Sequence, residues 1–210
     1  MVKRFLNVGL WFFCFVAIGY SQNSYELVDI TTLDSTILVD IKYATSDNFM
    51  GEVLYTANIC LLRRPVAERL VLVQKHLRNQ GYGLKIWDGY RPLSVQKKMW
   101  EKVPDPGFVA DPRYGSNHNR GAAVDVTLVD INGRDLEMPT GFDDFSEKAR
   151  SDYPDVSVTA QQHRFILQQA MTAYGFQTIN SEWWHFNDKD MKAYPVLDVP
   201  LEQFIEGRKQ

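Results

Sequence analysis

Two of the four histidines lie in segments whose other residues suit a metal site. His118 stands in a loop that bends at Gly121 and leads into an alternating segment carrying Asp125, and His185 follows Glu182 by three residues. If the fold brings them together, two imidazoles and one carboxylate form a three-ligand set that leaves the fourth position of a zinc ion open for water. The chemistry predicted from these residues is hydrolysis by a metal-activated water.

Such a reaction also needs a proton acceptor and a group that stabilises an oxyanion. Glu182 is the candidate acceptor. An offset of three residues would put Glu182 and His185 on opposite faces of a flat strand, so we predict a turn or bulge near Trp183. Arg91 sits on a Gly-Tyr-Arg-Pro corner, where we expect it to hold a fixed cation against the developing negative charge.

Each of these residues also has a purely structural interpretation. A single histidine near a strand is more often hydrogen-bonded within the fold than bound to a metal, and Arg91 alone would more often form a salt bridge. His76 and His163 have no carboxylate or glycine loop beside them in the sequence, and we interpret both as structural or surface residues. The identity of the metal stays open at this point, because a set of two histidines and an aspartate accepts other divalent ions.

Hydrophobic periodicity and turn residues predict the elements that must position these side chains. Helices are predicted over residues 65–80, 94–102 and 159–174. Strands are predicted over residues 84–88, 123–129, 135–138 and 178–186. We expect Ser94 to cap the second helix, and Thr159 with Gln162 to form a capping box for the third. The mixture predicts an α+β fold: a single domain with a central, mainly antiparallel sheet and helices packed against it.

The first 21 residues differ in composition from the rest. Lys3 and Arg4 precede a short apolar run, and Gly19 and Ser21 supply small residues before residue 22, which is the pattern of a secretory signal. We therefore expect residues 1–21 to be a signal peptide, residues 22–210 to be the catalytic domain, and the protein to be exported to the periplasm without stable membrane insertion. A retained anchor is the alternative, and a lipoprotein start at Cys14 is less favoured.

Composition excludes other classes of protein. Hydrophobic residues make up 45% of the chain and charged residues 23%, which indicates a globular protein rather than a disordered one. The net charge of -3 gives no cationic surface for nucleic acid. Without the leader, Cys60 is the single remaining cysteine, so no internal disulfide can form, and we expect Cys60 to be a small buried hydrophobic residue.

The two metal segments, SNHNRGAAVD (residues 116–125) and EWWH (182–185), together resemble the zinc D-alanyl-D-alanine dipeptidases, relatives of the D-Ala-D-Ala carboxypeptidases and of the hedgehog signalling domain. The stretches KYAT (42–45) and WDGYRP (87–92) are also similar to the dipeptidases. The resemblance covers nearly all of the chain after the leader. It implies a hedgehog or DD-peptidase-like fold.

The resemblance also implies roles for particular residues. One Zn2+ per chain is expected on His118, Asp125 and His185. Glu182 is expected to act as general base and then acid, with Arg91 stabilising the tetrahedral intermediate. The position of Asp143 matches the one that pairs with the ammonium of the dipeptide. The remaining expected pocket residues are Ser116, Tyr43 and Tyr55.

The expected substrate is D-Ala-D-Ala or a similar small D,D-dipeptide. One alternative is a D,D- or L,D-carboxypeptidase that trims peptidoglycan stem peptides. Another is a zinc-containing binding module without turnover, although Glu182 and Arg91 would have no purpose in such a module. The physiological role, whether cell-wall turnover, nutrient scavenging or glycopeptide resistance, and the oligomeric state are left open by the sequence.

Overall fold

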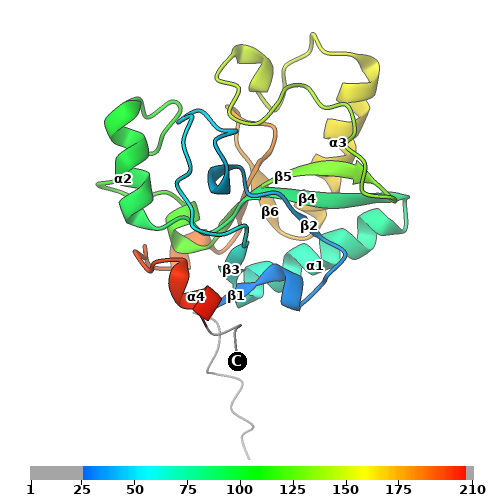
Figure 1. Ribbon diagram of the computed structural model, residues 1–210. Coiled ribbons are helices and arrows are strands. Elements are labelled where there is room, and N and C mark those ends of the chain that lie inside the picture. Colours follow the sequence, from blue (N-terminus) through cyan, green and yellow to red (C-terminus); the bar gives the residue numbers. More distant parts are fainter. Residues whose placement is uncertain (1–25, 207–210) are drawn as a thin grey trace, which may run out of the picture.

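The computed structural model describes residues 26–206, so the expected signal peptide lies outside the described residues. The main sheet has five strands in the order β2-β4-β5-β7-β6 (Figure 1). Its strands are Leu38–Val39 (β2), Tyr82–Asp88 (β4), Ala123–Asp130 (β5), Phe176–Thr178 (β6) and His185–Asp188 (β7). The β2 and β4 pair is parallel and the other three pairs are antiparallel. The prediction of an α+β fold with a mainly antiparallel sheet is confirmed.

Helices and a small second sheet surround this sheet. The helices are Arg64–Arg78 (α1), Leu93–Lys102 (α2), Val158–Ala173 (α3) and Glu202–Glu206 (α4), and strands Leu27–Asp29 (β1) and Leu61–Arg63 (β3) form the second sheet. Short 3-10 turns include Lys42–Ala44 (η2), His118–Arg120 (η3) and Glu147–Ala149 (η4). Helices α1 and α3 contact each other and the strands of the main sheet. Helix α2 stands apart from both (Figure 1).

The long helices begin and end near the predicted residues, but two predicted caps are wrong. Helix α2 starts at Leu93, and the backbone N–H of Ser94 donates to the carboxylate of Asp198 at 2.8 Å. Helix α3 is capped by Ser157, whose hydroxyl accepts from the Ala160 N–H, so Thr159 already lies inside the helix. In each case another oxygen satisfies the free N–H groups of the first turn.

Two of the predicted strands are also wrong in part. The segment predicted as one strand over residues 178–186 runs from the last residue of β6 through an irregular loop into the first residues of β7. The backbone of that loop bonds to residues before α3: Trp183 N–H donates to the Ala149 carbonyl, and Ser151 N–H to the Asn180 carbonyl. The 135–138 segment forms a single bridge, between Val129 and Asp135, rather than a strand.

The core lies between the sheet and the two long helices. Leu70 and Leu77 of α1, Val126 of β5 and Leu167 of α3 are fully buried, and burial of such side chains stabilises the fold by about 1.5–3 kcal/mol each. Cys60 is also fully buried, as predicted, and burial raises the pKa of its thiol. Among the described residues, none of the helices combines the length and apolarity that crossing a membrane requires.

Candidate active site

The loop before β5 turns His118 toward the sheet. His118 opens the 3-10 turn η3, and Gly121 ends that turn with a φ of 65°, a left-handed conformation that glycine adopts without a steric penalty. The N–H of Ala122 then donates to the carbonyl of Asn117. This tight bend brings His118, which is 3% exposed, beside Asp125 although seven residues separate them in the chain.

Strand pairing supplies the other two side chains. Asp125 on β5 is the register partner of His185 on β7, and opposed residues of an antiparallel pair project to the same face. Val124 and Val126, their neighbours on β5, are fully buried and lie on the opposite face by alternation. The sheet therefore presents a carboxylate and an imidazole side by side.

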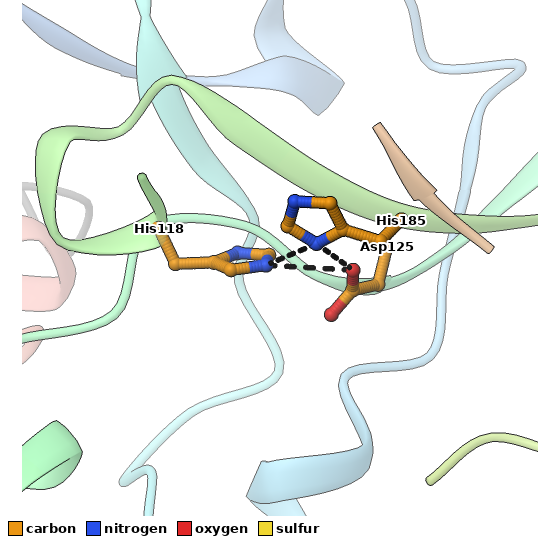
Figure 2. A group of neighbouring side chains, drawn as sticks. All are labelled: His118, Asp125 and His185. Carbon is orange, nitrogen blue, oxygen red and sulfur yellow. Dashed lines mark hydrogen bonds and ion pairs between the residues drawn. The ribbon is translucent and has the colours of Figure 1, made fainter. Parts of the chain in front are cut away.

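The three predicted ligands converge on one point (Figure 2). His185 Nδ1 lies 3.1 Å from His118 Nε2 and 3.0 Å from Asp125 Oδ1, and His118 Nε2 lies 3.4 Å from Asp125 Oδ1. Ligand atoms at ordinary bond lengths around a tetrahedral zinc are roughly 3.3–3.4 Å apart. The spacing of the donor atoms therefore suits a small divalent cation.

Hydrogen bonds at the far side of each ring fix which nitrogen faces this point. His118 Nδ1 lies 2.8 Å from the Gly89 carbonyl oxygen, and His185 Nε2 lies 3.0 Å from Asn187 Oδ1. Because an oxygen of this kind accepts a hydrogen bond, each of these nitrogens carries the ring proton. His118 Nε2 and His185 Nδ1 then direct lone pairs at the same point as Asp125, an arrangement that a cation stabilises.

The carboxylate of Asp125 and the imidazoles of the two histidines stabilise each other's charged forms. Burial alone would raise the pKa of Asp125, but the imidazoles of His118 and His185 outweigh it and hold that pKa well below its usual range. Burial alone would lower the pKa of His185, whereas Asp125 raises it to about 9. A metal ion would therefore compete with a proton for His185 Nδ1, and its binding would release that proton.

Glu182 lies in the irregular loop between β6 and β7, as the predicted turn near Trp183 requires. Its Oε2 is 3.9 Å from His185 Nδ1, and its side chain is 22% exposed. Burial raises the pKa of the Glu182 carboxyl, and His185 partly offsets this. The carboxylate is therefore close enough to the ligand set to exchange a proton with a molecule held there.

Arg91 lies beside the ligand set and is held from two directions. Its Nε and Nη2 donate to Asp88 Oδ2 at 3.1 and 2.7 Å, and its Nη1 donates to Gln96 Oε1 at 2.8 Å. Asp88 is fully buried and also accepts from the Tyr55 hydroxyl at 2.9 Å. A β-bulge in β4 between Ile86 and Asp88 shifts the register just before this carboxylate, as bulges next to active sites often do.

Asp143 has an unusual environment for a carboxylate. Its φ of 56° makes it the non-glycine residue with a left-handed backbone among the described residues, which is a conformation that aspartate tolerates locally. It accepts hydrogen bonds from the Tyr43 hydroxyl at 3.1 Å and the Phe49 N–H at 3.2 Å. Burial raises the pKa of Asp143 to about 7. Both of these donors are neutral groups, so the carboxylate can also pair with a cationic ligand in the cavity.

These groups share one cavity of about 270 Å³, close to the lower end of the volumes typical of small-ligand sites. The predicted site residues that line it are His118, Asp125, His185, Glu182, Arg91, Asp143, Ser116 and Tyr43. Ser116 places its hydroxyl 3.2 Å from the His118 N–H, which donates to it.

Tyr55 is not among the lining residues, because its hydroxyl is directed to Asp88. His76 and His163 bond elsewhere, to Gln80 and the Glu137 carbonyl respectively.

The supporting residues were not predicted as site residues from the sequence. Asp88 and Gln96 orient Arg91, and Asn187 orients His185. Asp88 lies in the WDGYRP stretch, and Asn187 lies two residues after a predicted ligand. For both residues, closeness in the sequence to a predicted site residue was therefore a usable signal. Gln96 gave none, since it lies on α2 and reaches the site only through the tertiary fold.

Comparison with known proteins agrees with this geometry. Residues 23–205 match the M15 peptidase family, described as D-ala-D-ala dipeptidase. The chain belongs to this family of metallopeptidases. The D-alanyl-D-alanine dipeptidase of Escherichia coli (strain K12) is 38% identical over 189 residues, which are 90% of this chain and 98% of the relative. That of Enterococcus faecium is 31% identical over 186 residues, 78% of this chain and 92% of the relative.

A solved structure with lower similarity is that of a vancomycin resistance D,D-dipeptidase in complex with a D-Ala-D-Ala phosphinate analogue. It is 19% identical, covers 88% of this chain and 72% of its own, and has a TM-score of 0.40.

Proposed function

We propose that this chain is a zinc peptidase that hydrolyses the D-alanyl-D-alanine dipeptide. The observation that carries the proposal is the convergence of His118, Asp125 and His185 within 3.0–3.4 Å, with the Glu182 carboxylate 3.9 Å from His185. The family and the similar dipeptidases supply the substrate class. A binding module without turnover would have no use for Glu182 and a fixed Arg91 at the same point.

One zinc ion per chain would be held by His118 Nε2, Asp125 Oδ1 and His185 Nδ1. When bound, zinc would polarise the scissile carbonyl and lower the pKa of water, so that the water loses a proton more readily and becomes a stronger nucleophile. The two imidazoles and the single carboxylate leave room for a further ligand, which is the arrangement of catalytic rather than structural zinc sites. Asn187 and the Gly89 carbonyl keep the two rings in the required tautomers.

Glu182 performs the proton transfers. Its carboxylate takes a proton from the attacking water and delivers it to the leaving amine of the second alanine. Burial, which raises the pKa of Glu182, makes the carboxylate a stronger base than an exposed one would be. The loop between β6 and β7 holds it on the same side as His185, three residues further along the chain.

Arg91 stabilises the negative charge that develops on the carbonyl oxygen. Asp88 and Gln96 use three of its five N–H groups, so two remain for the substrate. The guanidinium does not have to reorganise during the reaction, because its partners already fix its plane.

Asp143 binds the ammonium group of the dipeptide. An ammonium beside this buried carboxylate would favour its ionised form and lower its pKa. The Tyr43 hydroxyl and the Phe49 N–H hold the carboxylate in place, and Ser116 lines the same cavity. A carboxypeptidase acting on stem peptides would not need this pairing.

The direct test is release of free D-alanine from D-Ala-D-Ala by purified protein, with and without a chelator. Hydrolysis that stops with the chelator and returns with Zn2+ supports the proposal. The variant Asp143→Ala separates the two enzymatic alternatives: it should abolish most dipeptide cleavage by a dipeptidase, whereas a carboxypeptidase would keep its rate on longer peptides. A protein that binds zinc but cleaves no small D,D-peptide would be a binding module.

We also propose that the protein is exported to the periplasm after removal of residues 1–21. The support is the basic, apolar and small-residue pattern of this segment. N-terminal sequencing of the protein recovered from the periplasmic fraction tests the proposal. A protein that starts at residue 22 supports it, and an intact N-terminus in a membrane fraction supports a retained anchor instead.

A further inference from the structure

Three phenylalanines from different loops form a row along one wall of the cavity. Phe108 lies in the loop between α2 and η3, and Phe145 lies in the loop between β5 and α3. Their ring centroids are 4.7 Å apart, and the Phe145 ring is 5.3 Å from that of Phe49. All three residues line the cavity. These separations are typical of aromatic rings in direct contact, so the row closes the wall between the two loops.

The row stands beside Asp143. The N–H of Phe49 donates to Asp143 Oδ2 at 3.2 Å, and Phe145 follows Asp143 by two residues. The proposed zinc ligands line the same cavity. Tyr43 connects Asp143 to Arg91, because its hydroxyl bonds to Asp143 and the Arg91 guanidinium lies over its ring. A substrate lying between the metal and Asp143 would therefore end, at its amino side, against the aromatic row.

The loop that carries Phe108 is held by a bond to α2 and by bonds within the loop itself. Gln96 donates to the Ala110 carbonyl at 2.7 Å, and the N–H groups of Phe108 and Val109 donate to the Asp105 carbonyl at 3.0 and 2.8 Å. Gln96 is fully buried and also bonds to Arg91. The same glutamine thus links the position of the Phe108 loop to that of the guanidinium.

We propose that Phe108 and Phe145 close the amino-terminal end of the cavity and restrict the enzyme to free dipeptides. This inference rests on the proposed function, because it takes the ammonium of the substrate to lie at Asp143. A third residue attached to that amine would have to occupy space that the two rings fill. Phe108 and Phe145 are specificity residues in this assignment and take no part in bond cleavage.

The test compares two substrates in four proteins. The substrates are D-Ala-D-Ala and a tripeptide that ends in D-Ala-D-Ala, and the variants are Phe108→Ala, Phe145→Ala and the double variant. Removal of the rings should raise the ratio of tripeptide to dipeptide kcat/KM by about tenfold or more, since deletion of a close steric contact changes discrimination by this order. Phe165→Ala is the matched control, because Phe165 is a 60% exposed phenylalanine on α3 outside the cavity.

The outcomes separate this inference from the proposed function. If the wild-type protein cleaves D-Ala-D-Ala and the double variant still does not cleave the tripeptide, the aromatic pair does not set substrate length. If the wild-type protein cleaves no D,D-dipeptide, the proposed function itself fails. Phe108 is 43% exposed, so Phe108→Ala should fold even if Phe145→Ala does not, and an unchanged ratio in the folded Phe108→Ala protein would count against the pair.

Discussion

The guanidinium of Arg91 lies 5.1 Å from the centre of the Tyr43 ring, and this contact links the surroundings of His118 to those of Asp143. On one side the Tyr43 hydroxyl donates to Asp143. On the other side Arg91 donates to Asp88, whose Oδ2 is 3.6 Å from His118 Nδ1. A continuous chain of contacts therefore runs from His118, a proposed metal ligand, to the proposed ammonium site, and it fixes the distance between them.

Asp88→Asn should disrupt this chain of contacts at Asp88, a fully buried member. The substitution leaves the buried Arg91 charge without its anionic partner, and breaking such a pair costs about 3–5 kcal/mol of stability. We expect a loss of that size in chemical denaturation, and a lower kcat because Arg91 is no longer fixed. Tyr55→Phe is the control: it removes a hydrogen bond to the same carboxylate but keeps the charge, and should cost about 1.5–3 kcal/mol. Equal losses in both variants would show that the charge of Asp88 is unimportant.

The pKa of about 7 at Asp143 predicts a pH-dependent affinity. Below this pH the carboxyl is protonated and has no charge for the ammonium of the dipeptide. Wild-type kcat/KM should therefore fall as the pH drops through 7, by up to about tenfold per pH unit. Bound substrate favours the ionised form, so kcat should respond less.

Asp143→Asn provides the reference for this measurement. Asparagine tolerates the left-handed backbone of residue 143 but does not titrate. The Asn variant should have a low kcat/KM that depends less on pH between 6 and 8. If the wild-type and variant profiles have the same shape, another group governs the titration.

Zinc affinity should depend on Asn187 as well as on the three proposed ligands. Asn187 Oδ1 is bonded to His185 Nε2 and accepts from Asn117 at 2.8 Å. Loss of a hydrogen bond behind a metal ligand typically weakens metal binding by about 10–100-fold, so Asn187→Ala should release zinc to a competing chelator at correspondingly lower concentrations. Asn180→Ala, at an exposed loop position, should bind zinc like the wild type. Unchanged affinity in Asn187→Ala would show that the tautomer of His185 is fixed in another way.

The sequence predicted the local parts of this fold well. Helix α1 has a periodic apolar face between a proline near its start and a glycine after its end, and such signals depend only on neighbouring residues. The caps show the limit: α2 receives its capping carboxylate from Asp198, 104 residues after Ser94. No pattern within the helix could indicate that partner, so the nearest hydroxyl was predicted in its place.

The residues of the candidate site divide in the same way, into those with a local sequence signal and those placed only by the tertiary fold. His118, Asp125 and His185 were identified because their spacing and neighbours match a known pair of motifs, and the structure brings their donor atoms together. Gln96 was missed because its role depends on the contact between α2 and the loop at Ala110. The segment around Glu182 was predicted as one strand with a turn or bulge near Trp183, since aromatic residues favour strands. The break is longer than predicted, because the backbone there bonds to residues 149–151.

Gly121→Ala should test whether the bend before β5 sets the position of His118. A left-handed backbone costs an alanine about 1–2 kcal/mol, and a methyl group at Gly121 would also lie 2.6 Å from Leu27 Cδ2 and 3.3 Å from the Arg63 backbone nitrogen. Gly51 has a similar φ of 71° with no atom within 4 Å of such a methyl group, so Gly51→Ala measures the backbone cost alone. We expect a larger loss of unfolding free energy at Gly121, together with weaker zinc binding that Gly51→Ala does not show. Equal losses and equal zinc affinities would mean that the surroundings of Gly121 adjust to the methyl group without moving His118.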